Sequence, residues 1–411
     1  MRTLSAHTIG RREERKTGDL CGVRILVVMV SIPVQGMERA NLQIFKMMRE
    51  RGAEVLFVTE QTHGARVRRE VERIGCRWAM APFMSSFDER LHLTKNPGEM
   101  AAVVRAWAKA AWNLRRIHKE YQPTHVHLTN LSSFLYSLPA LRRAGQSIVF
   151  RLPNPPDLNL SGYKKKLHLW IWRRCVSTLC DVIVCNSRFA LSVLQDVGVA
   201  AYKTRVIPNC LAERVCAGKS DAPVVKSDRF NVIYLGRIRP QKGVKELFDA
   251  ALRMTADRRD VDFYFAGECH WKNPFAEGLI REVETRNLGS RIQFTGEIED
   301  IFGLLRQCHL HVCPSVSAGE SFPNVVLEAK SQGLPSVVFP TAGLAEAVTH
   351  LVDGYVCSEK SARELYDGIR YFLEDAGALK EAGEAARQSL EKFSRERVAE
   401  EWAALFKHGT E

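Results

Sequence analysis

At 411 residues the chain exceeds the roughly 250–300 residues at which a single hydrophobic core stops growing, so we expect two domains. With 45% hydrophobic and 26% charged residues it has the composition of a soluble globular protein, and no uncharged apolar run approaches the ~18 residues of a membrane span. Residues 1–20 form a polar tail without an apolar signal core, and the eleven cysteines show no disulfide framework. A cytoplasmic protein is therefore expected.

The net charge of +12 is unevenly distributed. Residues 1–210 hold 33 Lys and Arg against 16 Asp and Glu, whereas the rest of the chain holds 26 against 31. Within 101–210 the count is 16 basic to 4 acidic residues. Such a surface suits an anionic membrane, a phosphate-bearing acceptor or nucleic acid, with general solubility charge as the simpler alternative.

The first half of the chain alternates strand and helix patterns. An apolar run at 24–30 predicts a buried strand, and helical periodicity follows until Gly52. A long basic amphipathic helix is predicted over 98–120. Further strands are predicted over 54–59, 125–130, 147–152, 181–187 and 204–209. Periodicity is lost over 209–228, where we place the boundary between the two domains.

The second half repeats the alternation. A helix is predicted over 243–255. Strands are predicted over 231–236, 262–268, 291–297, 310–315 and 336–340. Alternation of this kind calls for a parallel sheet with helices on both faces, so the predicted fold class is α/β with two Rossmann-like domains.

The stretch GRIRPQKG (236–243) places two cations where a strand ends. Because ligands of such sheets bind at the carboxyl ends of the strands, Arg237 and Lys242 are expected to lie beside a ligand. A bidentate guanidinium next to an ammonium suits a diphosphate. A surface turn with solvated cations is the alternative that this stretch alone leaves open.

A second stretch, CPSVSAGESFPNVVLEAKSQGLP (313–335), leads from a strand into a helix. Pro323 suits the first helical position, and the amides of Asn324 and Val325 are predicted to bind an anion at the helix start. Glu320 lies in the preceding loop and Glu328 in the helix. Each carboxylate accepts hydrogen bonds from paired hydroxyls.

These motifs, in this order, resemble the retaining glycosyltransferases of family 4, also called group 1, which have the two-domain GT-B fold. Two glutamates separated by seven residues, with CPS before them and A-x-x-x-G-x-P after them, match the family signature. Other matching segments are QGMERA (35–40), CDVIVCNSRFA (180–190), VIPN (206–209), GRIRPQKG and AGLAEAVTHLVDGYVC (342–357). The resemblance therefore extends through nearly the whole chain.

The resemblance implies a role for each matching residue. Arg237 and Lys242 would hold the diphosphate of a nucleotide-sugar donor, UDP- or GDP-linked, and stabilise the leaving nucleotide. Glu320 would bind hydroxyls of the transferred sugar, and Glu328 the ribose. Gly36 would let the backbone of the N-terminal domain approach the phosphates.

The remaining implications concern the base, the acceptor and the domains. Ile298 would pack near the base, and Asn154 in FRLPNPPD stands near the place of a histidine common in the family. The expected domains are an acceptor-side domain (21–212) and a nucleotide-sugar domain (213–394) facing each other across a cleft, with a helix at 395–411 packing back toward the first. No metal or other cofactor is implied.

The predicted function is transfer of a sugar to a glycan or lipid-linked acceptor in cell-surface polysaccharide or glycolipid synthesis. A catalytically idle GT-B protein that binds a nucleotide sugar or serves a complex is the alternative, and an epimerase on the same fold is more remote. Nucleic-acid binding explains the charge but neither glutamate.

We also predict peripheral contact with an anionic membrane on its cytoplasmic face, through the helix 163–175 with Trp170 and Trp172 at the lipid interface.

Three stretches mimic metal sites. DVD (260–262) has Asp-x-Asp spacing, but we expect a solvated strand start there. CHLHVC (308–313) is expected to be a half-buried strand, because alternation along a strand sends neighbouring side chains to opposite faces. In HVH (125–127), His127 falls near a strand end and is predicted to border the cleft.

Overall fold

The computed structural model divides the chain into two compact units, Met1–Pro208 with Arg395–Glu411, and Asn209–Ser394. The predicted boundary at 212/213 lies outside the described residues. The predicted polar tail lies almost wholly outside them as well. The residues described are 18–30, 36–61, 64–84, 96–140, 145–152, 154–156, 160–210, 229–268, 273–317 and 321–407.

The first unit contains a seven-stranded sheet in the order β3-β2-β1-β4-β5-β6-β7, and every neighbouring pair is parallel. The strands are β1 (Arg24–Met29), β2 (Glu54–Glu60), β3 (Arg77–Ala81), β4 (His125–Leu128), β5 (Ser147–Leu152), β6 (Val182–Cys185) and β7 (Thr204–Val206). The helices are α1 (Gly36–Glu50), α2 (Ala65–Arg73), α4 (Pro97–Tyr121), α5 (Leu131–Ser137), α6 (Gly162–Trp170), α7 (Ser177–Leu179), α8 (Arg188–Val197) and α17 (Arg395–Lys407).

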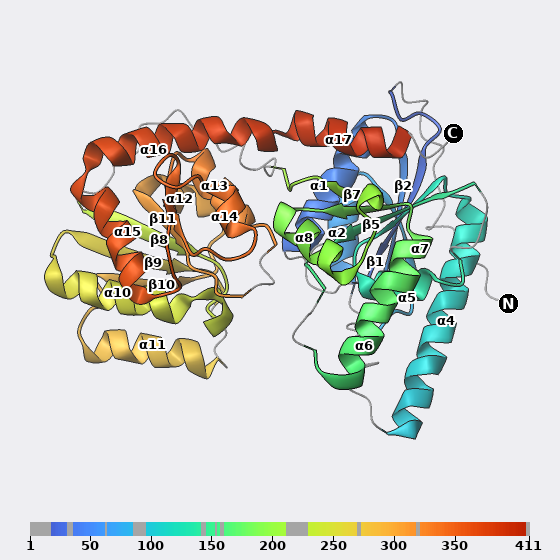
Figure 1. Cartoon of the computed structure of the whole chain (residues 1–411), viewed down its shortest axis with the longest axis horizontal. Helices are drawn as coiled ribbons and strands as arrows, with labels where there is room; N and C mark the ends of the chain where they lie inside the picture. Colours follow the sequence, from blue (N-terminus) through green and yellow to red (C-terminus); the bar gives the residue numbers. More distant parts are fainter. Residues whose placement is uncertain are drawn as a thin grey trace. The chain divides into compact units, whose positions relative to one another are not determined.

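The second unit contains a six-stranded sheet in the order β10-β9-β8-β11-β12-β13, again parallel throughout. The strands are β8 (Phe230–Leu235), β9 (Val261–Ala266), β10 (Ile292–Gly296), β11 (Leu310–Cys313), β12 (Ser336–Val338) and β13 (Gly354–Val356). The helices are α10 (Val244–Asp257), α11 (Pro274–Thr285), α12 (Ile301–Gln307), α13 (Asn324–Ser331), α14 (Leu344–Ala347), α15 (Ala362–Glu374) and α16 (Ala376–Gln388). In each unit, helices cover both faces of the sheet (Figure 1).

The prediction of two parallel α/β sheets is confirmed. Every predicted strand is present within one to three residues of its expected bounds, and the long basic helix spans Pro97–Tyr121. Two edge strands, β3 and β13, were not predicted. Short edge strands have one hydrogen-bonded neighbour and weak apolar patterning, so periodicity reveals them poorly. Within the described part of the chain, no helix is both long and apolar enough to cross a bilayer.

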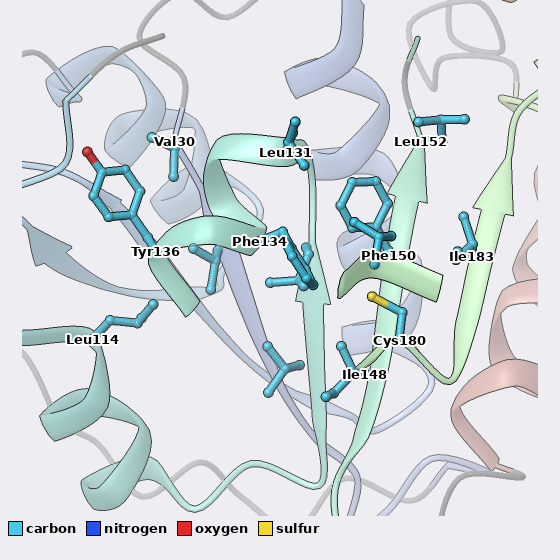
Figure 2. Packing of buried hydrophobic residues seen from close by; sticks show 14 of the residues in the cluster. Val30, Leu114, Leu131, Phe134, Tyr136, Ile148, Phe150, Leu152, Cys180 and Ile183 are labelled. Carbon is cyan, nitrogen blue, oxygen red and sulfur yellow. The ribbon is translucent and has the colours of Figure 1, made fainter. Parts of the chain in front are cut away.

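A cluster of apolar residues forms the core of the first unit between its sheet and helices α4 and α5. Figure 2 shows part of it, in which Phe134 of α5 and Phe150 of β5 lie side by side with ring centroids 6.3 Å apart. Trp172 also belongs to this core: it is 3% exposed and packs against Phe150 at 5.4 Å. The prediction that Trp172 lies at a lipid interface is therefore wrong.

Helix α17 closes the other face of the same sheet, beside α1. Trp402 and Phe406 of α17 pack around His127 of β4, together with Phe45 of α1. His127 is fully buried, and neither of its ring nitrogens has a hydrogen-bond partner among the described residues. The prediction that His127 borders a cleft is therefore wrong, because α17 covers the strand that carries it.

Burial keeps both histidines of β4 neutral. It lowers the pKa of His125 to about 4, and it holds the pKa of His127 well below its ordinary value, with Arg151 adding to that effect. His125 is also hydrogen-bonded through Nδ1 to the Thr124 hydroxyl at 2.9 Å. In the unfolded chain both rings titrate near pH 6.5. Below that pH the unfolded state therefore binds more protons than the folded state does.

We therefore predict that the stability of the first unit falls as pH is lowered from 7.5 through 6.5 toward 4. Protons bind the unfolded histidines but not the buried ones, and His125 alone contributes a loss of ~2 kcal/mol by pH 5. The measurement is urea unfolding followed by tryptophan fluorescence, since six of the seven tryptophans lie in this unit.

The variant His127→Phe should flatten the pH dependence, because it keeps an aromatic ring and removes a titrating group. An equally steep pH dependence in His127→Phe would contradict the assignment.

Candidate functional site

The candidate site lies in the second unit, where three parallel strands end on glycines. Gly236, Gly267 and Gly296 end or follow β8, β9 and β10, and all three have positive φ. A Cβ on Gly267 would lie 2.1 Å from the carbonyl oxygen of Gly236, so the two loops touch through their backbones. This is the edge of the sheet at which parallel α/β folds bind ligands.

Arg237 and Lys242 belong to the loop that follows β8. The Tyr234 hydroxyl donates to the Arg237 carbonyl at 2.9 Å, and the Asn273 side chain donates to the Ile238 carbonyl at 2.7 Å. Lys242 ends a short 3-10 turn, Pro240–Lys242. Both cations are half-buried, and the backbone that carries them is held on two sides.

The loop after β11 is bound directly to this loop. The carbonyl of Gln241 accepts from the amides of Val316 and Ser317 at 3.2 and 3.3 Å. Gly243 makes the approach possible, because a Cβ there would lie 1.7 Å from the Pro314 oxygen. The structure thus joins GRIRPQKG to CPSVS, two motifs more than seventy residues apart in the chain.

Helix α13 begins seven residues after Ser317. Pro323 is extended at φ −88° and ψ 100° and caps the helix, so the helix starts one residue later than predicted. Among the described residues, no side chain caps its first amides, those of Asn324 and Val325. Glu328 lies one turn further on and is half-buried. Glu320 lies in 318–320, outside the described residues.

The other predicted site residues lie apart from these two loops in the chain. Ile298 is half-buried two residues after β10 and packs against an apolar cluster that includes Ala266 and Leu305. Gly36 is the first residue of α1 in the first unit, and Asn154 is exposed just after β5. Their roles toward a ligand stay predictions.

Sequence reasoning missed one buried charge beside the site. Lys330 of α13 is fully buried, and its Nζ donates to Asp353 at 2.6 Å and to the Ser389 hydroxyl at 3.0 Å. Burial lowers the pKa of Lys330, while the hydrogen bond to Asp353 opposes that shift. No local pattern signals this pair, since Asp353 lies twenty-three residues away and a helical lysine is ordinarily exposed.

The stretches that mimic metal sites form ion pairs and strand contacts. Asp262 of DVD is only 6% exposed and binds Arg229 and Arg291, so the expectation of a solvated carboxylate is wrong there. Strand β11 within CHLHVC is wholly rather than half-buried, because it is an inner strand of a parallel sheet that helices cover on both faces, and its His311 bonds to the Ser336 hydroxyl. Among the described residues, no group of three His, Cys, Asp or Glu side chains could hold a metal ion.

Comparison with known proteins identifies the family. Residues 34–212 match the model of glycosyltransferase family 4, and residues 219–389 match that of the glycosyl transferases group 1. The chain belongs to glycosyltransferase family 4, group 1. The match begins just before α1 and continues through β7, then resumes before β8 and ends at η4 (Ser389–Phe393).

Relatives and solved structures agree with this assignment. An N,N'-diacetylbacillosaminyl-diphospho-undecaprenol α-1,3-N-acetylgalactosaminyltransferase of Campylobacter jejuni is 31% identical over 175 residues, which are 43% of this chain and 44% of that protein. An uncharacterised glycosyltransferase of Haemophilus influenzae is 20% identical over 90% of this chain and 96% of its own length. The Anabaena HepE structure with UDP superposes with a TM-score of 0.76 at 18% identity, covering 94% of this chain and 100% of that one. The fold is GT-B.

We predict that Gly243→Ala destabilises the second unit by more than about 2 kcal/mol. Its φ of +67° disfavours any side chain, and the added methyl would overlap the Pro314 carbonyl. Gly278→Ala in α11 is the matched control: no atom of the described residues lies within 4 Å of an added Cβ, so we expect a neutral or slightly stabilising change. Urea unfolding followed by circular dichroism measures the free energy of unfolding of both variants. A Gly243→Ala variant as stable as Gly278→Ala would contradict the close approach of the two loops.

Proposed function

We propose that the protein is a retaining glycosyltransferase that moves a sugar from a nucleotide-diphosphate donor to a glycan or lipid-linked acceptor. The observation that carries the proposal is the joining of the two motif loops through Gln241, which brings the Arg237–Lys242 loop next to the segment that leads into α13. The family supports it, and so does the binding of UDP and UDP-glucose by the similar protein HepE.

In this proposal the donor diphosphate binds Arg237, Lys242 and the first amides of α13. A guanidinium and an ammonium offset the charge that develops on the departing nucleotide, and the helix dipole adds to that effect. Because these cations and the helix amides offset the diphosphate charge that a divalent ion offsets in metal-dependent sites, transfer proceeds without a metal ion. Glu328 binds the ribose, Glu320 binds the transferred sugar, and Ile298 packs near the base. Other cofactors are not required.

The acceptor belongs to cell-surface polysaccharide or glycolipid synthesis. The Campylobacter relative is named for a lipid-linked diphosphate acceptor. In this proposal a lipid-linked acceptor meets a nucleotide sugar from the cytoplasm, so the enzyme works at the cytoplasmic face of a membrane. The charge of the first half of the chain supports this location.

Helix α6 offers a membrane-binding surface in the first unit. Tyr163, Leu167 and Trp170 recur at i, i+4 and i+7 and form an exposed stripe, with Tyr163 65% and Trp170 55% exposed. Lys164, Lys165 and Lys166 follow Tyr163 on the same helix. An apolar stripe with flanking cations is typical of helices that lie in the interface of an anionic bilayer.

We predict that Arg237→Ala and Lys242→Ala each lower sugar transfer about 10²–10³-fold while the protein stays folded. Each change removes one preorganised charge from the diphosphate site. The measurement is turnover with a panel of UDP- and GDP-sugars in the presence of EDTA. Arg239→Ala is the matched control, because Arg239 is an exposed cation of the same loop. Wild-type turnover in either variant would remove that residue from the site, and loss of all transfer in EDTA would contradict metal independence.

We predict that the protein floats with liposomes that contain anionic lipid, and that salt weakens this binding. Each cation near an anionic surface contributes ~1 kcal/mol, screened within a Debye length. Replacing Lys164, Lys165 and Lys166 with glutamate should lower binding at least tenfold. The same reversal of the exposed Arg259, Arg281 and Lys380 of the second unit is the control and should change it little. Indifference to anionic vesicles at low salt would overturn the membrane proposal and leave the donor site standing.

A further inference from the structure

The chain passes from the first unit to the second between Pro208 and Asn209, and it returns between Ser394 and Arg395. These two crossings lie far apart in the sequence, yet on the side of the second unit both are attached to one helix. That helix is α13, which carries Asn324, Val325 and Glu328.

The first crossing is attached through a side-chain hydrogen bond. Asn209 Nδ2 donates to Asn324 Oδ1 at 2.7 Å, and Asn209 is only 7% exposed. Asn324 is the first residue of α13, in the turn whose backbone amides have no partner within the helix. The bond to Asn209 restrains the side chain of Asn324, and with it the residue at which the helix begins.

The returning crossing is attached by packing and a second polar contact. The 3-10 turn η4 (Ser389–Phe393) directly precedes it, and the Lys330 ammonium reaches Ser389 at 3.0 Å. Phe393 packs on Phe322 with ring centroids 5.4 Å apart, just before α13. Leu327 and Leu390 complete the same apolar cluster.

We propose that Asn209 is a positioning residue of the donor site, which acts through Asn324 to hold the start of α13 in its anion-binding form. The proposal rests on the function proposed above for α13. It adds that the first residue after the crossing controls the helix that receives the nucleotide, so the crossing and the donor site are mechanically coupled.

A double-mutant cycle with UDP and GDP as probes tests the proposal. Calorimetry on Asn209→Ala should show an affinity three- to tenfold below wild type, the range expected for one neutral hydrogen bond. Asn324→Ala should show a similar loss, and the double variant should be no weaker than the weaker single variant, since both changes remove the same interaction. Asn113→Ala in α4 of the first unit is the control and should bind as wild type does. Fully additive losses, or wild-type affinity in Asn209→Ala, would overturn the proposal.

Hydrogen exchange without nucleotide separates this proposal from the proposed function. In Asn209→Ala, amides of a peptide covering 322–331 should exchange at least threefold faster than in wild type, while a peptide from α15 should not change. Unchanged exchange over 322–331 would overturn the role of Asn209 even if nucleotide binds. Failure of wild type to bind either nucleotide would instead refute the proposed function, while faster exchange in Asn209→Ala would still support the link to α13.

Discussion

The candidate site depends on the close approach of two backbones, that of the loop 236–243 and that of the loop 313–317. Gln241 accepts from two amides of the second loop, and Gly243 lies where no side chain could fit. Because the contact is made by main-chain atoms, the two loops can shift little relative to each other. A site that stabilises developing charge needs such rigidity, since every reorganisation of its donors subtracts from the stabilisation.

Helix α13 is held from behind by a charge that the site itself does not use. The buried ammonium of Lys330 is costly to desolvate, and its hydrogen bonds to Asp353 and to the Ser389 hydroxyl together offset that cost. Asp353 in turn accepts from the Thr349 amide. The pair thereby connects α13, the turn before β13 and the turn that leads out of the second unit.

The first unit shows how helix phase decides what a residue does. Trp170 and Trp172 are two positions apart, about 200° around a helix, so only one of them can face solvent. Trp170 is exposed, whereas Trp172 donates through Nε1 to His168 and packs in the core. The composition of the segment does not distinguish the two tryptophans. Helical periodicity applied to it would have assigned them to opposite faces of the helix. The π-helical turn Ile171–Val176 adds a local irregularity that no residue pattern here indicates.

The sequence by itself determined the parallel α/β class, the positions of eleven of the thirteen strands among the described residues, and the motifs of the family, because periodicity and loop chemistry are local properties of the chain. It also placed Arg237 and Lys242 at a strand end. Only the tertiary structure decided which distant residues meet. Asn209 reaches Asn324, Lys330 reaches Asp353, and α17 folds over His127. These pairings depend on how elements from distant parts of the chain pack, and the free energy of such packing is not encoded in any short stretch.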